Sequence, residues 1–217
     1  MKLKHAFLSL AAAVSFAAPA FAAPVQFNID SLTLTPGIGY GVNSEDLLDV
    51  LFTAQGAPGS FALDLAGTSS KTFTVSTVQL REECINPGGC PKPDQGAGNE
   101  TKNLNVGVTF HFVNPLTGNQ NVTVIGSATP GMVNDAQDDY SLSFTALDYT
   151  FGNGGKFRLD LSDLTFNNLG TQNLTATITL LAAPTGNPGT NVPEPASLAL
   201  MGLGLAGLAV RGKRRKV

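Results

Sequence analysis

Residues 104–112 alternate strictly between apolar and polar side chains, and this alternation constrains the fold of the chain more than any other feature. Every second position is apolar: Leu104, Val106, Val108, Phe110 and Phe112. A strand turns successive side chains to opposite faces, whereas a helix cannot bury residues at this spacing on one face. The spacing therefore predicts a β-strand with one buried face.

The same period of two recurs along the rest of the chain. Apolar residues fall on one face of segments 142–146, 157–161 and 174–180. We expect these strands and the first one to line a single core. Weaker alternation predicts two further strands, at 60–65 and 120–127.

Other segments change their apolar period partway along. Shifts by one residue occur in segments 25–34, 73–80 and 161–166. Because such a shift moves the side chains to the opposite face, it predicts a bulge or a break in strand pairing. Residues 44–52 fit either a short helix capped by Ser44 or a strand.

Turns rich in glycine and proline separate the predicted strands, for example at 56–59, 114–119 and 152–155. About eight or nine short strands punctuated in this way predict an all-β fold in a single domain, an antiparallel β-sandwich, with a jelly-roll-like barrel as the alternative. One longer connection, 84–100, joins two of the predicted strands. A connection of this length is either functional or loosely ordered.

The N-terminus has the pattern of a secretory signal peptide. Lys2 and Lys4 precede an apolar stretch, 6–18, and a small-x-small site at Ala20-Phe21-Ala22. We expect signal peptidase to cleave between Ala22 and Ala23. The predicted organisation is a signal peptide (1–22), a β-sandwich domain (23–182), a polar Pro/Gly linker (183–192) and a C-terminal tail (193–217).

The tail joins three unlike pieces. Pro193-Glu194-Pro195 cannot enter a helix, because each proline fixes φ and lacks an N–H. The next 15 residues, 196–210, are apolar. As a helix they would span about 22 Å of a hydrocarbon core of about 30 Å, a short transmembrane anchor. The cations that follow place the C-terminus in the cytoplasm: Arg211, Lys213, Arg214, Arg215 and Lys216.

Residues 192–217 resemble the PEP-CTERM sorting domain of exported proteins from Gram-negative bacteria, in which the membrane protease-transpeptidase exosortase recognises the Pro-Glu-Pro unit. The resemblance implies a protein that is inserted transiently in the inner membrane, processed by exosortase and delivered to the cell surface or the biofilm matrix. Such proteins often accompany exopolysaccharide, which makes exopolysaccharide a candidate partner. The alternative for the tail is an ordinary single-pass anchor.

The charge of the exported segment limits its partners. Residues 23–192 contain six basic and fifteen acidic residues, a net charge of −9. A domain this acidic is not expected to bind nucleic acid or anionic lipid. The basic end of the tail is a topology signal rather than a nucleic-acid patch.

The composition of the exported segment argues against an enzyme. His111 is its only histidine, so triads and metal sites built from several histidines are excluded. Chemistry based on Ser-Lys or on paired carboxylates has no motif to mark it. We therefore expect a non-catalytic protein without a cofactor.

One cluster of oxygen ligands leaves room for calcium. Asp135, Asp138 and Asp139, together with the amides of Asn134 and Gln137, crowd into a predicted loop. Ca²⁺ prefers such ligands, although the spacing is not that of an EF-hand. A solvated loop is the simpler interpretation.

The aromatic residues indicate whether the chain could bind sugar, because sugars stack on exposed aromatic rings. The chain has no Trp and three Tyr, and its phenylalanines fall mostly at core-facing positions. A calcium- or glycan-binding module of the extracellular matrix remains the alternative function.

Cys84 and Cys90 are the only cysteines, and the exported location predicts a disulfide between them. The CxxC spacing of redox-active pairs is absent. Alkylation of the exported protein should find no free thiol. Replacing both cysteines with serine should cost at most about 2 kcal/mol, because the closed loop is short. Two alkylatable thiols in the native exported protein would contradict the pairing.

Overall fold

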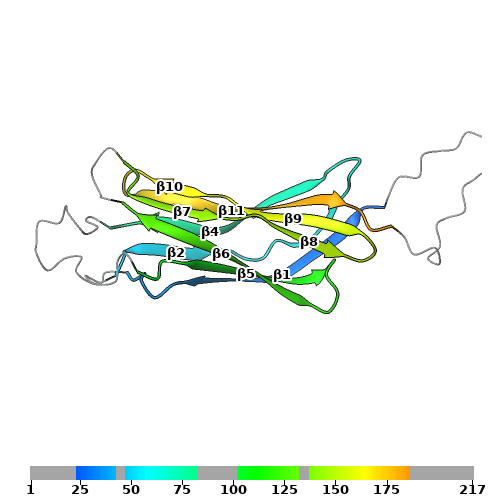
Figure 1. The fold of residues 1–217 in the computed structure, drawn as a ribbon, viewed down its shortest axis with the longest axis horizontal. Helices are drawn as coiled ribbons and strands as arrows, with labels where there is room; N and C mark the ends of the chain where they lie inside the picture. Colours follow the sequence, from blue (N-terminus) through cyan, green and yellow to red (C-terminus); the bar gives the residue numbers. More distant parts are fainter. Residues whose placement is uncertain (1–22, 43–46, 83–101, 132–136, 186–217) are drawn as a thin grey trace, which may run out of the picture. The chain divides into compact units, whose positions relative to one another are not determined.

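The computed structural model describes residues 23–42, 47–82, 102–131 and 137–185 (Figure 1). Every helix or strand in this part of the chain is a β-strand, which confirms the predicted all-β class. The signal peptide, the tail, Asp135 and the cysteine pair lie outside the described residues.

The strands form two curled antiparallel sheets that pack together, as predicted for the domain (Figure 1). The first sheet has the order β10-β7-β6-β5-β1-β3, with β1 (Val25–Pro36), β3 (Gly59–Leu63), β5 (Val106–Asn114), β6 (Gln120–Pro130), β7 (Tyr140–Phe144) and β10 (Leu164–Phe166). The second has the order β2-β4-β11-β9-β8, with β2 (Val50–Ala54), β4 (Ser70–Leu80), β8 (Leu147–Phe151), β9 (Gly155–Leu161) and β11 (Gly170–Ala182). We call this unit, Ala22–Thr185, the two-sheet domain.

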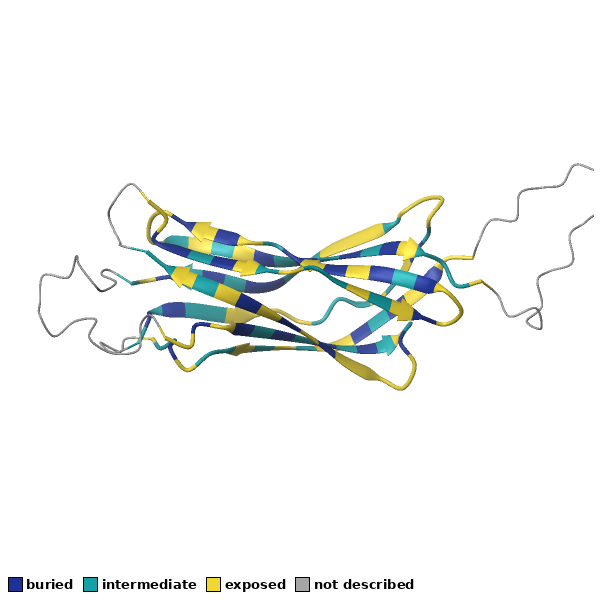
Figure 2. Cartoon of the chain, in the orientation of Figure 1, coloured by how far each residue is buried: buried dark blue, intermediate teal, exposed yellow. Residues whose placement is uncertain are grey.

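The alternating segments form the strands that line the core. On β5 every second side chain is buried, and Figure 2 shows the same alternation of buried and exposed residues along the other long strands. The predicted strands at 157–161 and 174–180 are confirmed as parts of β9 and β11, and the one at 104–112 is confirmed from Val106, where β5 begins. Burial of one face per strand is what holds the two sheets together.

Three stretches of chain pass from one sheet to the other with little interruption. β2 continues into β3, β7 into β8, and β9 into β10. The last passage explains the predicted shift at 161–166: the apolar period breaks at Ser162-Asp163 because the strand changes sheets there. Asp163 fixes this corner by accepting a hydrogen bond from the backbone N–H of Phe144, at 2.9 Å.

The other two predicted phase shifts are bulges. In β1 the pairing with β5 shifts between Asn28 and Ser31. In β4 the partner of Leu174 is Ser76 and that of Thr175 is Thr74, so Val75 is the extra residue. The buried Ser76 hydroxyl donates to the carbonyl of Thr53 at 3.0 Å, which satisfies its polar group.

Segment 44–52, which fitted a helix or a strand, is described only from Leu47 onward. Residues 43–46 lie outside the described chain, and the strand β2 begins at Val50. Leu48, fully buried, forms a single parallel bridge with Tyr40.

The aromatic side chains of the described chain belong to the core or pack against it. This confirms the core-facing positions predicted for the phenylalanines. The rings are Phe27, Tyr40, Phe52, Phe61, Phe73, Phe110, Phe112, Tyr140, Phe144, Tyr149, Phe151, Phe157 and Phe166.

The two ends of the domain differ in what they carry. β1 begins where β11 ends: Phe27 packs on Phe157, which pairs with Leu180 (Figure 1). We call this the tail end, because Thr185, the last described residue, lies there. The opposite end holds Tyr40 and the start of β7.

Candidate functional site

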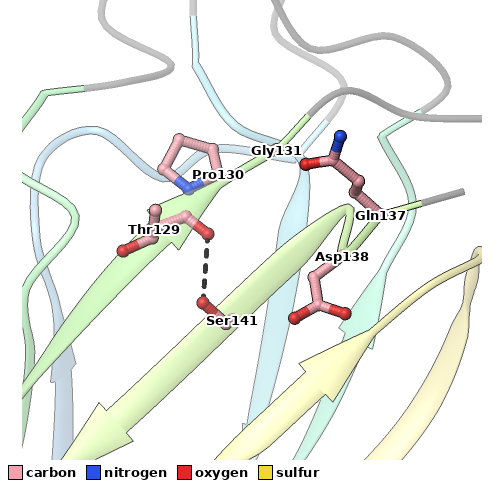
Figure 3. Close-up of a pocket in the computed structure, with 6 residues that line it drawn as sticks. All are labelled: Thr129, Pro130, Gly131, Gln137, Asp138 and Ser141. Carbon is pink, nitrogen blue, oxygen red and sulfur yellow. Dashed lines mark hydrogen bonds between the residues drawn. The ribbon is translucent and has the colours of Figure 1, made fainter. Parts of the chain in front are cut away.

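The described part of the predicted acidic loop lies at the end of the domain opposite the tail end, where β6 ends and β7 begins. An open pocket there is lined by Thr129, Pro130, Gly131, Gln137, Asp138 and Ser141 (Figure 3). The Ser141 hydroxyl donates to the carbonyl of Thr129 at 3.5 Å across the pocket floor. Gly131 is required at this position, because a Cβ there would stand 1.9 Å from the carbonyl oxygen of Asp138.

Of the predicted calcium cluster, the two described carboxylates, Asp138 and Asp139, do not share one surface. Asp138 is exposed and lines the pocket, whereas Asp139 is fully buried, with its backbone N–H bonded to the carbonyl of Phe166 at 2.7 Å. Within the described chain no group of three His, Cys, Asp or Glu residues is arranged to hold a metal ion. Calcium binding stays a prediction that rests on Asp138 and on Asp135, outside the described residues. Calorimetric titration with Ca²⁺ of the wild-type protein and of Asp138→Asn tests it.

Two tyrosines meet at the same end of the domain. The Tyr40 hydroxyl lies 2.7 Å from the carbonyl of Leu104 and 2.8 Å from the Tyr140 hydroxyl. Because Tyr40 donates its single proton to Leu104, Tyr140 donates to Tyr40. The pair therefore ties the chain after β1, the chain before β5 and the start of β7 together.

Burial sets the ionisation of this pair. The pKa of Tyr40 is raised, first by burial and then by the neighbouring Tyr140. Burial also raises the pKa of Tyr140, while its hydrogen bond to Tyr40 acts in the opposite direction. Both phenols stay neutral in the folded protein well above the pH at which free phenols ionise. The arrangement makes this pair a structural tie.

The domain should lose stability as the pH rises above about 10, the ordinary pKa of a phenol. Above that pH the unfolded chain releases the two protons that the folded chain keeps, so unfolding becomes easier. With two protons involved, the pair lowers the free energy of unfolding by up to about 2.7 kcal/mol for each pH unit. Urea unfolding from pH 8 to 11.5 should show a shallower decline for the Tyr40→Phe, Tyr140→Phe variant. Equal slopes would mean that the pair does not govern alkaline unfolding.

The outer face of the second sheet carries a charged group of its own. Asp148 on β8 contacts Arg158 at 2.7 Å and Lys156 at 2.9 Å, both on β9. Arg158, and then Lys156, lower the pKa of Asp148 to about 2. The carboxylate, in turn, raises the pKa of Arg158. This is an exposed cross-strand cluster that joins the β8–β9 hairpin.

His111, the only histidine of the exported segment, has a specific partner. Its Nδ1 lies 2.5 Å from Oδ1 of Asp30, a residue on the neighbouring strand β1. Both side chains are partly exposed. Sequence reasoning missed this pair because Asp30 stands 81 positions earlier in the chain.

The residues predicted to be processed lie mostly outside the described chain. Ala23 is described and is exposed just before β1, so the predicted signal cleavage would leave a short free N-terminus. Ala20, Ala22, Pro193, Glu194, Pro195 and the basic end from Arg211 to Lys216 lie outside. Among the described residues no helix is long and apolar enough to cross a membrane.

A comparison with known families identifies the tail. Residues 191–215 match the PEP-CTERM protein-sorting motif. The predicted resemblance is confirmed, and it is confined to this C-terminal segment. The motif implies an exported protein that is sorted by exosortase. No curated protein and no solved structure matches the chain, so the role of the two-sheet domain is argued from its own residues.

Proposed function

We propose that the chain is a non-catalytic protein of the cell surface or the biofilm matrix. The signal peptide starts its export, the tail holds it briefly in the inner membrane, and exosortase releases the two-sheet domain at or beside Pro193-Glu194-Pro195. The observation that carries this proposal is the PEP-CTERM motif at residues 191–215, which follows a domain whose packing ends at Thr185.

The length of the apolar run supports a transient anchor. A helix over 196–210 would leave about 8 Å of hydrocarbon unmatched, a strain that a permanent anchor avoids with a longer span. The two prolines around Glu194 keep the recognised strip extended outside the membrane. Both features suit a segment that is cut soon after insertion.

The outer faces of the sheets support a role in contacts rather than in catalysis. Rows of hydroxyls cross the strands, and two threonine pairs are hydrogen bonded at 2.8 Å: Thr109 with Thr123, and Thr72 with Thr177. Hydroxyl rows offer donors and acceptors to a hydrated polymer such as exopolysaccharide, the candidate partner. The net charge of −9 over residues 23–192 keeps the released domain soluble.

Fractionation of two strains tests the proposal. In a host with exosortase, the protein should be recovered from the surface or the medium. In the same host without exosortase, a form that has lost its signal peptide but kept its tail should stay in the inner membrane. The same distribution in both strains would contradict the proposal.

A further inference from the structure

The first residues of the predicted linker are held on the two-sheet domain. The backbone N–H of Thr185 donates to the carbonyl of Asn153 at 2.8 Å, and the Thr185 hydroxyl donates to the same oxygen at 3.0 Å. Ala183 packs against the core, and Pro184 is half-buried. We call residues 183–185 the strap.

The strap rests on the turn between β8 and β9, which has a defined shape. Gly152 and Gly154 adopt positive φ angles of 50° and 80°, a conformation that favours glycine. A Cβ on Gly152 would stand 3.3 Å from Cβ of Pro184, so the strap lies close over this turn. The turn therefore presents the Asn153 carbonyl to Thr185 in a fixed place.

The strap shortens the tether between the domain and the sorting motif. Seven residues, 186–192, separate Thr185 from Pro193, which gives a reach of at most about 28 Å. Without the strap the tether would start after Ala182 and would reach about 38 Å. Because Thr185 is bound at the tail end, this reach is the greatest distance that can separate that residue from Pro193.

The charges at the tail end permit a close approach to a membrane. Its turns, 64–69, 115–119 and 152–154, contain one ionisable side chain, Asp64. Lys71 and Lys156 lie in the adjoining strands, and Lys156 is paired with Asp148 on β8. The turns at this end therefore carry little negative charge, which lowers the repulsion between this end and anionic lipid.

We propose that the strap positions the sorting motif for cleavage. By fixing the exit of the tail on the β8–β9 turn, it holds the tail end of the domain toward the membrane and sets the reach of Pro193-Glu194-Pro195. The inference rests on the proposed processing by exosortase, and it makes Thr185 and its neighbours positioning residues.

Shortening the tether tests this in the full chain, expressed in a host with exosortase. Deleting residues 186–190 leaves the matched motif, 191–215, intact and leaves two residues after the strap. Cleavage, followed by pulse labelling, should slow by about tenfold or more, because the domain then collides with the membrane or the enzyme. A matched variant with five Gly and Ser residues in place of 186–190 should cleave within about twofold of wild type.

Releasing the strap should then restore cleavage. In the deletion background, Ala183→Gly, Pro184→Gly and Thr185→Gly free three more residues and should speed cleavage by about threefold or more. The same three changes with the full tether should leave the rate unchanged, which shows that they do not harm export. The inference fails if the deletion cleaves like wild type, if the Gly/Ser replacement is slow, or if release restores nothing. In this experiment the proposed function itself fails only if wild type is never cleaved.

Discussion

Replacing Phe157 with alanine should destabilise the two-sheet domain by about 3–5 kcal/mol, the largest stability loss that we expect from any single substitution. A domain of this size has a total stability of about 5–15 kcal/mol. The variant should therefore unfold at a much lower urea concentration and be recovered from cells in smaller amounts.

The reason is the position of the Phe157 ring between the two sheets. It lies on β9 and is 0% exposed. Its centroid is 5.4 Å from those of Phe27 and Phe112, which come from the other sheet, and 5.5 Å from that of Tyr149. Truncation would remove contacts to both sheets and leave a cavity that these rigid rings cannot fill.

An exposed apolar residue provides the matched control. Ile125, on the outer face of β6, is 64% exposed, so Ile125→Ala should change the free energy of unfolding by no more than about 0.5 kcal/mol. Urea unfolding followed by circular dichroism measures both variants. Similar losses for Phe157→Ala and Ile125→Ala would show that the core is not packed as described.

Replacing Pro193, Glu194 and Pro195 with alanine should have the largest effect on processing. Alanine would let a helix over the apolar run extend backward, and it removes the residues that exosortase is expected to recognise. The variant should lose its signal peptide normally and then accumulate, uncleaved, in the inner membrane.

Immunoblots of the membrane and surface fractions follow this variant, and a change within the tether controls for it. Gly186→Ala, Asn187→Ala and Pro188→Ala also alter three consecutive residues and remove a proline, yet they leave the matched motif untouched. This control should be processed like wild type. Normal release of the Pro-Glu-Pro variant would show that the unit is not what the protease reads.

The strands that a local pattern specifies were predicted well. Alternation within 104–112 depends on neighbouring residues alone, and the strand β5 follows it. The described residues form eleven strands where the sequence predicted about eight or nine, because two passages between the sheets, at 145–146 and 162–163, contain neither glycine nor proline. Without a turn residue between them, two strands in different sheets look in the sequence like one strand whose apolar alternation shifts by one residue.

The contacts of the candidate site depend on residues far apart in the chain. Tyr40 and Tyr140 are separated by 100 positions, so no local pattern brings them together. The acidic cluster was predicted from composition, which does not say where each carboxylate points. Asp138 and Asp139 precede β7 directly, and the alternation of an extended chain could have indicated that they face opposite sides.

The strap shows a similar limit of composition. Residues 183–192 are rich in proline and glycine, which predicts a linker from its first residue. The bond between Thr185 and the Asn153 carbonyl depends on the β8–β9 turn, whose place beside the end of β11 is set by the pairing of β9 with β11. Tertiary contacts of this kind are read from the structure alone.

The mass of the C-terminal peptide of the wild-type protein, recovered from the cell surface, tests the central claim most directly. The proposal predicts a chain that begins at Ala23 and ends at or beside Pro193-Glu194-Pro195, without the apolar run and the basic end. A surface protein whose C-terminal peptide still carries Arg211 to Val217 would contradict sorting by exosortase and would leave a simple membrane anchor.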